Sequence, residues 1–327
     1  MSSGFDVTCV GESLVDFVSM TSADSLADVP AFVKVAGGAP LNVAVGVARL
    51  GRRSAFVGKV GNDSFGRFLK RELKKTGVDT RGVVADEKRK TRLAFVSVSR
   101  DGERDFEFWE RHPADQELRL ADVDLARVFR SRIVHIGSFL LLNNPARTTV
   151  LRVAEAARHE GCEVCFDPNL RLSVWRSQRE ARSLIRQMAA RSSILRMNDQ
   201  EARFVTGARG PENSAMALRG LGPDMVLITC AEKGCFYSCN ESAGFVTGFK
   251  VKPVDTTGCG DGFLAGVLSA YCNIGKEIKN LTSDDMEGIC RVGNAVGALT
   301  ALKRGAVSAL PSARELTSFL RARRAKT

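Results

Sequence analysis

The chain has 327 residues, of which 44% are hydrophobic and 26% charged, and it carries a net charge of +11. This composition supplies a large core and excludes intrinsically disordered, collagen-like and coiled-coil proteins. The longest uncharged apolar stretches, residues 133–146 and 262–275, are too short to span a bilayer, and the N-terminus lacks the pattern of a secretory signal. We therefore expect a cytoplasmic protein without a membrane partner.

Strand-like and helical patterns alternate along the chain. The predicted strands are Phe5–Val10, Ser54–Gly58, Ile133–Gly137, Glu163–Asp167, Ile194–Met197 and Met225–Thr229. The predicted helices are Pro40–Leu50, Phe65–Leu73, Thr148–His159 and Phe263–Tyr271. Repeated β-α units of this kind imply one α/β domain over residues 1–327, with a mainly parallel sheet covered by helices on both faces.

Two segments in the first third of the chain break this alternation. Leu14–Val35 shows no helical period, and Leu93–Ser99 with Arg104–Trp109 forms a predicted hairpin that turns at Asp101-Gly102. Strands that do not fit a parallel sheet can form a small separate flap. We therefore expect a lid, made of segments 12–36 and 91–113, that closes over a ligand and excludes water.

The positive charge is spread along the chain, with its densest runs at Glu87–Arg92 and Arg321–Lys326. A basic protein attracts anions such as nucleotides and sugar phosphates. No helix-turn-helix, zinc-finger or RNA-binding signature accompanies the charge, which argues against specific binding of nucleic acid. A basic surface solvated by water needs no macromolecular partner.

The nine cysteines include the C-x-x-C pair Cys162 and Cys165, which could be combined with Cys235 and Cys239 into a zinc site. However, residues 162–166 have the pattern of a strand, in which residues three apart point to opposite faces. We therefore interpret these cysteines as buried, reduced thiols of the core.

The most informative stretch is residues 255–263, Asp-Thr-Thr-Gly-Cys-Gly-Asp-Gly-Phe, which leads into an apolar helix. Its glycines at positions 258, 260 and 262 allow the backbone to approach a ligand closely, and the start of a helix favours anions. A carboxylate beside an anion site fits a base that takes a proton from a hydroxyl attacking a phosphoryl group. Asp261 has this position, although a role as a simple helix cap is the alternative.

Three further groups of polar residues lie at predicted strand ends or helix starts, where ligands bind in open α/β folds. Asp16 follows the first strand, and Asn42 follows Gly37-Gly38 at the start of a helix. Both are side chains that pair with sugar hydroxyls. Asn198 and Glu201 follow another strand, where their oxygens could hold Mg²⁺ directly or through water. Walker, dinucleotide-binding and protein-kinase motifs are absent from the sequence, which excludes those classes of phosphoryl transferase.

Two long motifs, residues 37–51 and residues 255–261, are similar to the signatures of the ribokinase (PfkB) family of carbohydrate kinases. Further matches are residues 56–63, residues 166–171 followed by Trp175, and residues 304–311. The chain thus resembles this family, and within it the fructokinases, over essentially its whole length. The resemblance implies a ribokinase-like three-layer sandwich with a small β lid. It also implies transfer of the γ-phosphate of ATP to a free ketohexose, fructose being converted to fructose 6-phosphate.

The resemblance also implies a role for each matching residue. Asp261 would be the general base, and the backbone of Gly258, Cys259 and Gly260 would form the anion hole for the γ-phosphate. The sugar would be bound by Asp16, Gly37, Gly38, Asn42 and Arg171. The nucleotide would be bound by Asn198, Glu201, Thr229, Gly234 and Asn294. Asn198 and Glu201 would also organise Mg²⁺ through water, and Asp255 and Thr257 would help to hold a monovalent cation such as K⁺.

The chain departs from the family pattern at four positions. Ala231 replaces the usual glycine after Thr229, which places a Cβ where nucleotide phosphates approach the backbone. Cys259 replaces an alanine in the anion hole and suggests sensitivity to thiol reagents, and Gly262 replaces Ala or Ser. Glu110 stands where fructokinases have a basic residue after the lid aromatic.

Several interpretations remain open from the sequence. A 2-keto-3-deoxygluconate kinase is the nearest alternative, because Arg171 could pair with a carboxylate. Ribose and nucleosides are weaker candidates. An inactive kinase-like scaffold, a nucleic-acid-associated subunit or a sugar sensor would be expected to lose residues such as Asp261, Asn198 and Glu201, which this chain retains. The resemblance also implies a possible homodimer through the β lid.

Overall fold

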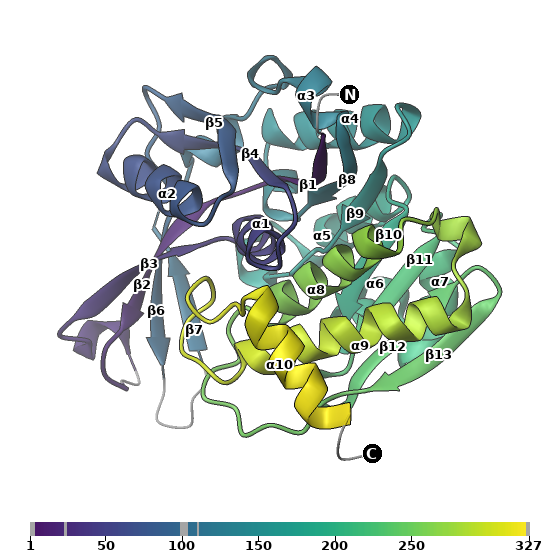
Figure 1. Ribbon diagram of the computed structural model, residues 1–327. Coiled ribbons are helices and arrows are strands. Elements are labelled where there is room, and N and C mark those ends of the chain that lie inside the picture. Colours follow the sequence, from purple (N-terminus) through teal and green to yellow (C-terminus); the bar gives the residue numbers. More distant parts are fainter. Residues whose placement is uncertain (1–3, 23–24, 99–103, 110, 325–327) are drawn as a thin grey trace.

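Residues 4–22, 25–98, 104–109 and 111–324 are described by a computed structural model (Figure 1). The strands of a large sheet are β1 (Phe5–Val10), β4 (Ser54–Gly61), β5 (Asp79–Asp86), β8 (Ser131–Ile136), β9 (Glu163–Phe166), β10 (Ile194–Asn198), β11 (Met225–Thr229), β12 (Gly234–Cys239) and β13 (Ser242–Thr247). Their order across the sheet is β13-β12-β11-β10-β9-β8-β1-β4-β5. All neighbouring pairs from β11 to β5 are parallel, whereas β11-β12 and β12-β13 are antiparallel.

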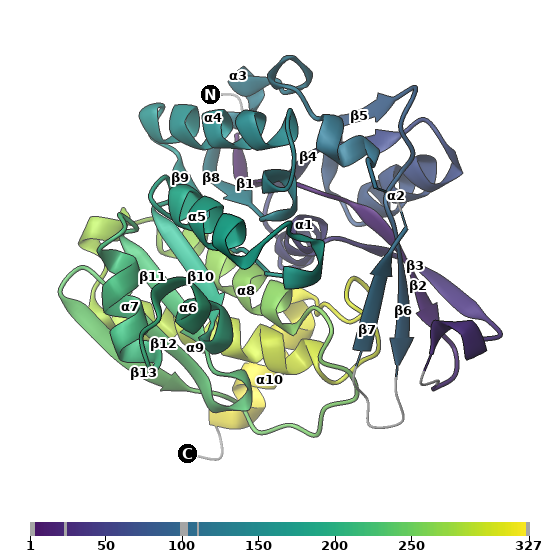
Figure 2. The same ribbon diagram turned by 180° about the vertical axis from the view of Figure 1, so that it is seen from behind.

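Helices cover both faces of the large sheet. They are α1 (Ala39–Arg49), α2 (Ser64–Lys75), α3 (Leu125–Val128), α4 (Ala146–His159), α5 (Gln178–Ala189), α6 (Asp199–Thr206), α7 (Pro211–Arg219), α8 (Cys259–Ile274), α9 (Ser283–Thr300) and α10 (Ala313–Arg324). Figure 1 shows α1, α8, α9 and α10 on one face, and Figure 2 shows α4, α5, α6 and α7 on the other. Each face has its own apolar core. The expected three-layer α/β sandwich is therefore confirmed.

Most predicted elements are present, and two match to the residue, β1 and β11. The sequence analysis missed β5, β12 and β13, of which the last two form an antiparallel edge. It also placed the start of α8 at Phe263, whereas the helix begins at Cys259. The glycines in this first turn masked the helical period, because glycine carries no side chain to mark the apolar face.

The small sheet consists of β2 (Leu14–Ser19), β3 (Phe32–Gly37), β6 (Leu93–Val98) and β7 (Arg104–Phe108), in the order β3-β2-β6-β7. It projects from one side of the large sheet in both views (Figures 1 and 2). The expected β6-β7 hairpin is present, while its turn at Asp101-Gly102 lies outside the described residues. The other segment expected in the flap, Leu14–Val35, contributes most of the antiparallel β2-β3 pair. Strand β2 also pairs with β6 in parallel.

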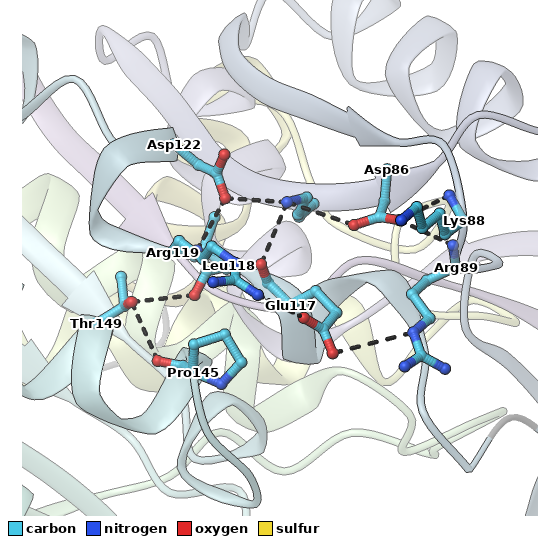
Figure 3. Close-up of polar contacts among 10 residues, drawn as sticks. Asp86, Lys88, Arg89, Glu117, Leu118, Arg119, Asp122, Pro145 and Thr149 are labelled. Carbon is cyan, nitrogen blue, oxygen red and sulfur yellow. Dashed lines mark hydrogen bonds and ion pairs between the residues drawn. The ribbon is translucent and has the colours of Figure 1, made fainter.

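Polar contacts tie the chain to the large sheet where it returns from the small sheet (Figure 3). The ammonium group of Lys59 on β4 lies 3.0 Å from a carboxylate oxygen of Asp122 and 3.4 Å from one of Asp86. It also donates a hydrogen bond to the carbonyl oxygen of Glu117. Nearby, the Thr149 hydroxyl donates to the carbonyl oxygen of Leu118. This segment, residues 114–122, is therefore anchored to both β4 and α4.

No helix within the described part of the chain is long and apolar enough to cross a membrane.

Candidate active site

A cavity of about 330 Å³ lies at the carboxyl ends of the parallel strands. The strand ends of β1, β9 and β10, the N-termini of α1 and α8, and the small sheet all contribute to it. Its walls consist of Glu12, Leu14, Asp16, Gly38, Ala39, Asn42, Phe108, Phe139, Asn169, Arg171, Arg196, Asn198, Thr256, Thr257, Gly258, Gly260, Asp261 and Ala306. Residues from distant parts of the sequence meet here, as the strand-end argument predicted.

The N-terminus of α8 opens into this cavity. Gly258 precedes the helix with a φ of 73°, a left-handed conformation that suits glycine. The amide of Gly262 donates to the carbonyl oxygen of Gly258 at 2.7 Å and closes the first helical turn. The unpaired N–H groups of a helix start carry partial positive charge, so this turn favours an anion. As the sequence predicted, the glycine-rich turn lies at a helix N-terminus, and Gly258 and Gly260 line the cavity.

The other glycines of this turn serve close packing. A Cβ on Gly262 would lie 2.6 Å from the hydroxyl oxygen of Thr300. Gly262 does not line the cavity, so its departure from the family pattern is a matter of packing between α8 and α9. A Cβ on Gly260 would lie 2.8 Å from two guanidinium nitrogens of Arg196.

Asp261 lies in the first turn of α8 with 5% of its surface exposed. Its Oδ2 accepts a hydrogen bond from the Asn42 amide at 2.7 Å, and its Oδ1 lies 3.4 Å from the Asn169 amide. It does not cap the helix, because the N-cap residue is Gly258. Burial raises the pKa of Asp261 to about 6, against the lowering effect of the Asn42 hydrogen bond. A buried carboxylate with this pKa is ionised at neutral pH and still accepts a proton readily.

The loop before α1 brings sugar-site candidates beside Asp261. Gly38 has a φ of 108°, and a Cβ there would lie 2.7 Å from the carbonyl oxygen of Glu12. A Cβ on Gly37 would lie 2.2 Å from Asp16 Oδ2. These two glycines therefore let the loop close onto the end of β1 and the start of β2. Asp16 and Gly38 line the cavity, whereas Gly37 supports Asp16 from behind.

Glu12 is a cavity residue that the sequence analysis did not identify. Its Oε1 accepts a hydrogen bond from the Ala39 amide at 3.2 Å, which satisfies an N–H group at the start of α1. Its Oε2 is buried without a partner among the described residues. Burial raises the pKa of Glu12 to about 8, so the group is largely protonated at neutral pH.

Asp167, Asn169 and Arg196 were also missed. Arg196 Nη1 lies 3.0 Å from Asp167 Oδ2, and this ion pair is almost fully buried. Asp167 Oδ1 also accepts a hydrogen bond from the backbone N–H of Asn169. This bond holds Asn169 in a turn with a φ of 39°. This turn directs the Asn169 side chain toward Asp261. The motif match over residues 166–171 was the available signal for Asp167 and Asn169, whereas nothing in the apolar pattern of β10 marked Arg196.

Asn198 and Glu201 form a reciprocal cap at the start of α6. Asn198 Oδ1 accepts from the Glu201 amide, and Glu201 Oε2 accepts from the Asn198 amide, both at 2.8 Å. Glu201 Oε1 accepts from the Leu170 amide at 2.6 Å. Asn198 lines the cavity and Glu201 lies behind it. Both carboxylate oxygens of Glu201 thus accept backbone N–H groups, so this side chain supports the cavity wall at Asn198 and Leu170.

The remaining nucleotide-site candidates do not line the cavity. The Thr229 hydroxyl accepts a hydrogen bond from Arg196 Nη2 at 2.7 Å, so it is linked to the cavity wall. Gly234 starts β12, where a Cβ would lie 2.1 Å from the carbonyl oxygen of Val246. Asn294 donates to the same carbonyl at 3.0 Å. Gly234 and Asn294 therefore hold the β12-β13 edge against α9.

The Ala231 departure has a measurable backbone consequence. Ala231 adopts a φ of 49°, which a residue with a Cβ rarely occupies. It lies in a short turn between β11 and β12. The chain therefore keeps the left-handed conformation that glycine would adopt freely.

The proposed cation-site residues join two loops. Asp255 Oδ1 accepts from the Thr257 amide at 2.9 Å and from its hydroxyl at 2.8 Å, and Asp255 Oδ2 accepts from the Gly305 amide at 2.7 Å. Carboxylate, hydroxyl and carbonyl oxygens suit a hard cation. Among the described residues, no three His, Cys, Asp or Glu side chains gather into a metal cluster.

All nine cysteines are free thiols. Burial raises the pKa of Cys259 to about 12, so few of its thiols are ionised at neutral pH. Since the thiolate is the reactive form, this position does not favour the expected sensitivity to thiol reagents. Glu110, the departure expected in the lid, lies outside the described residues.

Comparison with known proteins agrees with the residue pattern. The sequence profile of the pfkB family carbohydrate kinases matches residues 5–313. Fructokinase-2 of Solanum habrochaites is 40% identical over 323 residues, which cover 98% of this chain and 97% of the relative. The crystal structure of fructokinase from Vibrio cholerae O395 with fructose, ADP and calcium has a TM-score of 0.86 and 32% identity, covering 98% of this chain and 100% of that one. A double mutant of that enzyme with fructose, ADP and potassium also has a TM-score of 0.86, with 31% identity and the same coverage.

Proposed function

We propose that this chain, which belongs to the pfkB family of carbohydrate kinases, transfers the γ-phosphate of ATP to free fructose and forms fructose 6-phosphate. The observation that carries the proposal is Asp261, a buried carboxylate beside a helix N-terminus in the cavity at the strand ends. A base and an anion site in contact are what phosphoryl transfer to a hydroxyl requires. The chain is a carbohydrate kinase, and the proposal concerns its substrate and the roles of its residues.

In the proposed mechanism, the Asn42 and Asn169 amides hold the Asp261 carboxylate in place. Asp261 accepts the proton of the sugar hydroxyl as its oxygen attacks the γ-phosphorus. The start of α8, at Gly258, Cys259 and Gly260, would face the charge on the transferring group with its partial positive charge, while the Cys259 N–H itself donates to the carbonyl oxygen of Thr256. Asp16, Gly37, Gly38, Asn42 and Arg171 would bind the sugar, in agreement with the position of most of them in or beside the cavity.

The nucleotide is proposed to lie toward β10 and β11, near Asn198 and Thr229, with Gly234 and Asn294 shaping the edge beside it. Glu201 would hold Mg²⁺ through water, and this ion would neutralise charge on the phosphates. Asp255 and Thr257 would help to hold K⁺. The structures of the Vibrio cholerae enzyme contain a calcium ion or a potassium ion, which supports cation binding by this chain.

Fructose is favoured over 2-keto-3-deoxygluconate by the cavity wall. Asp16 and Asp261 place two carboxyl groups in the cavity wall, which suit the hydroxyls of a neutral sugar and disfavour the carboxylate of the keto acid. Arg171 is the one observation that favours the keto acid, because its guanidinium lies in the same wall. A comparison of kcat/KM for fructose and for 2-keto-3-deoxygluconate decides between these two substrates.

The test is a coupled ADP-release assay with Mg²⁺-ATP and fructose, 2-keto-3-deoxygluconate, ribose, glucose or adenosine, with and without K⁺. The proposal expects the highest kcat/KM for fructose. Preference for the keto acid would retain the mechanism and assign Arg171 to the carboxylate. No turnover of any sugar by folded protein would overturn the proposal and favour a scaffold role.

We also propose that the small sheet acts as a lid and as a homodimer interface. Met20, Val33 and Trp109 expose 62%, 46% and 66% of their surfaces there, which is unusual for large apolar side chains. Sedimentation of the wild type and of a Trp109→Ser variant tests this interface. A cytoplasmic location agrees with nine free thiols, and cell fractionation tests it.

A further inference from the structure

Arg196 is a buried cation in the wall of the cavity. It lies on β10 between residues that are fully buried and apolar, and only 7% of its own surface is exposed. Two of its nitrogens have partners, Asp167 at 3.0 Å and the Thr229 hydroxyl at 2.7 Å. Its Nε has no partner among the described residues. A buried guanidinium with an unsatisfied N–H is costly to the fold, which calls for a functional explanation.

The guanidinium packs against the backbone of Gly260, the second residue of α8. A Cβ on Gly260 would lie 2.8 Å from both Nη1 and Nη2 and 3.1 Å from Cζ. The absence of a side chain at this position is therefore what allows the cation to reach the anion hole. Arg196 and Gly260 both line the cavity, as does Asp261, the residue after Gly260.

Asp167 and Thr229 fix the direction of this charge. The ion pair with Asp167 holds one edge of the planar guanidinium, and the bond to Thr229 holds the other. The two partners lie at the ends of β9 and β11, on either side of β10. A charge held in this way needs no reorganisation during a reaction, which is the property that makes electrostatic stabilisation effective.

We propose that Arg196 is a catalytic residue whose fixed positive charge stabilises the γ-phosphoryl group during its transfer, a role that rests on the proposed kinase function. An oxygen lone pair of the sugar hydroxyl forms the new bond to the γ-phosphorus. The bond from that phosphorus to the bridging oxygen breaks, and its electron pair leaves on ADP. The hydroxyl proton passes to Asp261, while Arg196 keeps its own protons throughout. Negative charge on the phosphoryl oxygens thus develops between the α8 N-terminus and the guanidinium.

A purely structural role is the alternative. Arg196 could serve only to hold Asp167, and through it the turn that directs Asn169 toward Asp261. That role would act by displacing Asp261, so it predicts a lower kcat with no selective loss of affinity for a mimic of the transferring phosphoryl group. The catalytic role predicts a lower kcat together with that selective loss of affinity, while sugar binding is retained.

The experiment compares the Arg196→Met, Arg196→Lys and Arg147→Met variants with the wild type. Arg147 is a matched control, because it also pairs with a carboxylate and with backbone carbonyls but lies outside the cavity. We expect Arg196→Met to lower kcat by about 10²–10³-fold, as for loss of one transition-state donor, with the fructose KM within about threefold. Arg196→Lys should retain part of the rate, and Arg147→Met should retain all of it.

A second measurement separates this inference from the proposed function. The affinity for Mg²⁺-ADP with aluminium fluoride, a mimic of the transferring phosphoryl group, is measured beside the affinity for Mg²⁺-ADP alone. We expect Arg196→Met to weaken only the first. If the wild type phosphorylates no sugar, the proposed function fails, while this comparison still reports on Arg196. Equal weakening of both affinities, or a raised KM with kcat retained, would overturn the inference.

The double variant Arg196→Met/Asp167→Asn covers the case in which Arg196→Met does not fold. It removes both members of the Arg196–Asp167 ion pair, and asparagine can still accept the backbone N–H of Asn169. This variant should fold and show the same loss of kcat. A folded double variant with wild-type kcat would also overturn the inference.

Discussion

The large sheet and the small sheet differ in how they are supported. The large sheet lies between two apolar cores and two layers of helices (Figures 1 and 2). The small sheet adds only a few side chains to these cores, such as Val15 to one and Phe108 to the other, and it exposes Met20, Val33 and Trp109. Asp261, Arg196 and the α8 N-terminus all belong to the well-supported part. The comparison fits the proposal that the reacting groups are held by the large sheet and its helices, while the small sheet serves as a lid that excludes water.

The largest expected effect follows from removing the base in the well-supported part. Asp261→Asn retains the hydrogen-bond acceptor for Asn42 but cannot take a proton. We expect kcat to fall by about 10²–10⁴-fold while fructose binding survives. Steady-state kinetics and calorimetric titration with fructose measure the two quantities. A decrease of less than tenfold in kcat would remove Asp261 from this role.

The joint between the large sheet and the small sheet contains a buried ion pair between Arg92 and Asp115. Arg92 Nη2 lies 2.9 Å from Asp115 Oδ2, and neither side chain exposes more than 5%. Arg92→Met would leave a buried carboxylate unpaired, and we expect a loss of about 3–5 kcal/mol in the free energy of unfolding. Urea denaturation measures this change.

The exposed pair Lys279–Glu277 provides a control for the joint. Lys279→Met should leave the stability unchanged, because both side chains are solvated. The double variant Arg92→Met/Asp115→Leu should recover most of the loss. A stable Arg92→Met protein would show that the joint does not depend on this pair.

The pH dependence sharpens the role of the well-supported part. Burial, together with the charge of Asp167, raises the pKa of Asp261 to about 6, and the base must be ionised to act. We therefore expect kcat to be constant above this pH and to fall about tenfold per unit below it. The residual kcat of the Asp261→Asn variant should not fall in this way at low pH. A wild-type rate that is independent of pH between 5 and 7 would contradict the assignment.

The small sheet has its own aromatic cluster, centred on Phe95. The ring of Phe95 lies 5.1 Å from Phe17, 5.4 Å from Phe32 and 5.3 Å from Trp109. We expect Phe95→Ala to raise the fructose KM about tenfold and to permit ATP hydrolysis without sugar, because a loosened lid admits water. The same substitution should barely change the melting temperature. A large drop in melting temperature would show that the small sheet is part of the main folding unit.

The smallest expected effect concerns Ala231, in the well-supported part. Replacing it with glycine removes a side chain from a left-handed conformation, and we expect a gain of about 1 kcal/mol in the free energy of unfolding. The control is Ala243→Gly in the extended strand β13, which should lose stability. Urea denaturation distinguishes the two signs. A loss of stability in Ala231→Gly would mean that the left-handed conformation is not strained.

The sequence predicted the parts of this molecule that local pattern controls. The strand–helix alternation, the Gly37–Asn42 loop and the position of Asp261 all follow from residues close together in the chain. Arg196 was missed because its partners lie 29 and 33 positions away, and only the sheet register brings them together. The antiparallel β12-β13 edge was missed for a related reason, since short strands rich in glycine and cysteine lack a clear period.

The most direct test of the account is identification of the product formed from ATP and ¹³C-labelled fructose. Nuclear magnetic resonance of the mixture shows which oxygen carries the phosphate. The account predicts fructose 6-phosphate and ADP in equal amounts from the wild type, and almost none from Asp261→Asn. ADP with free inorganic phosphate and unchanged fructose would contradict it.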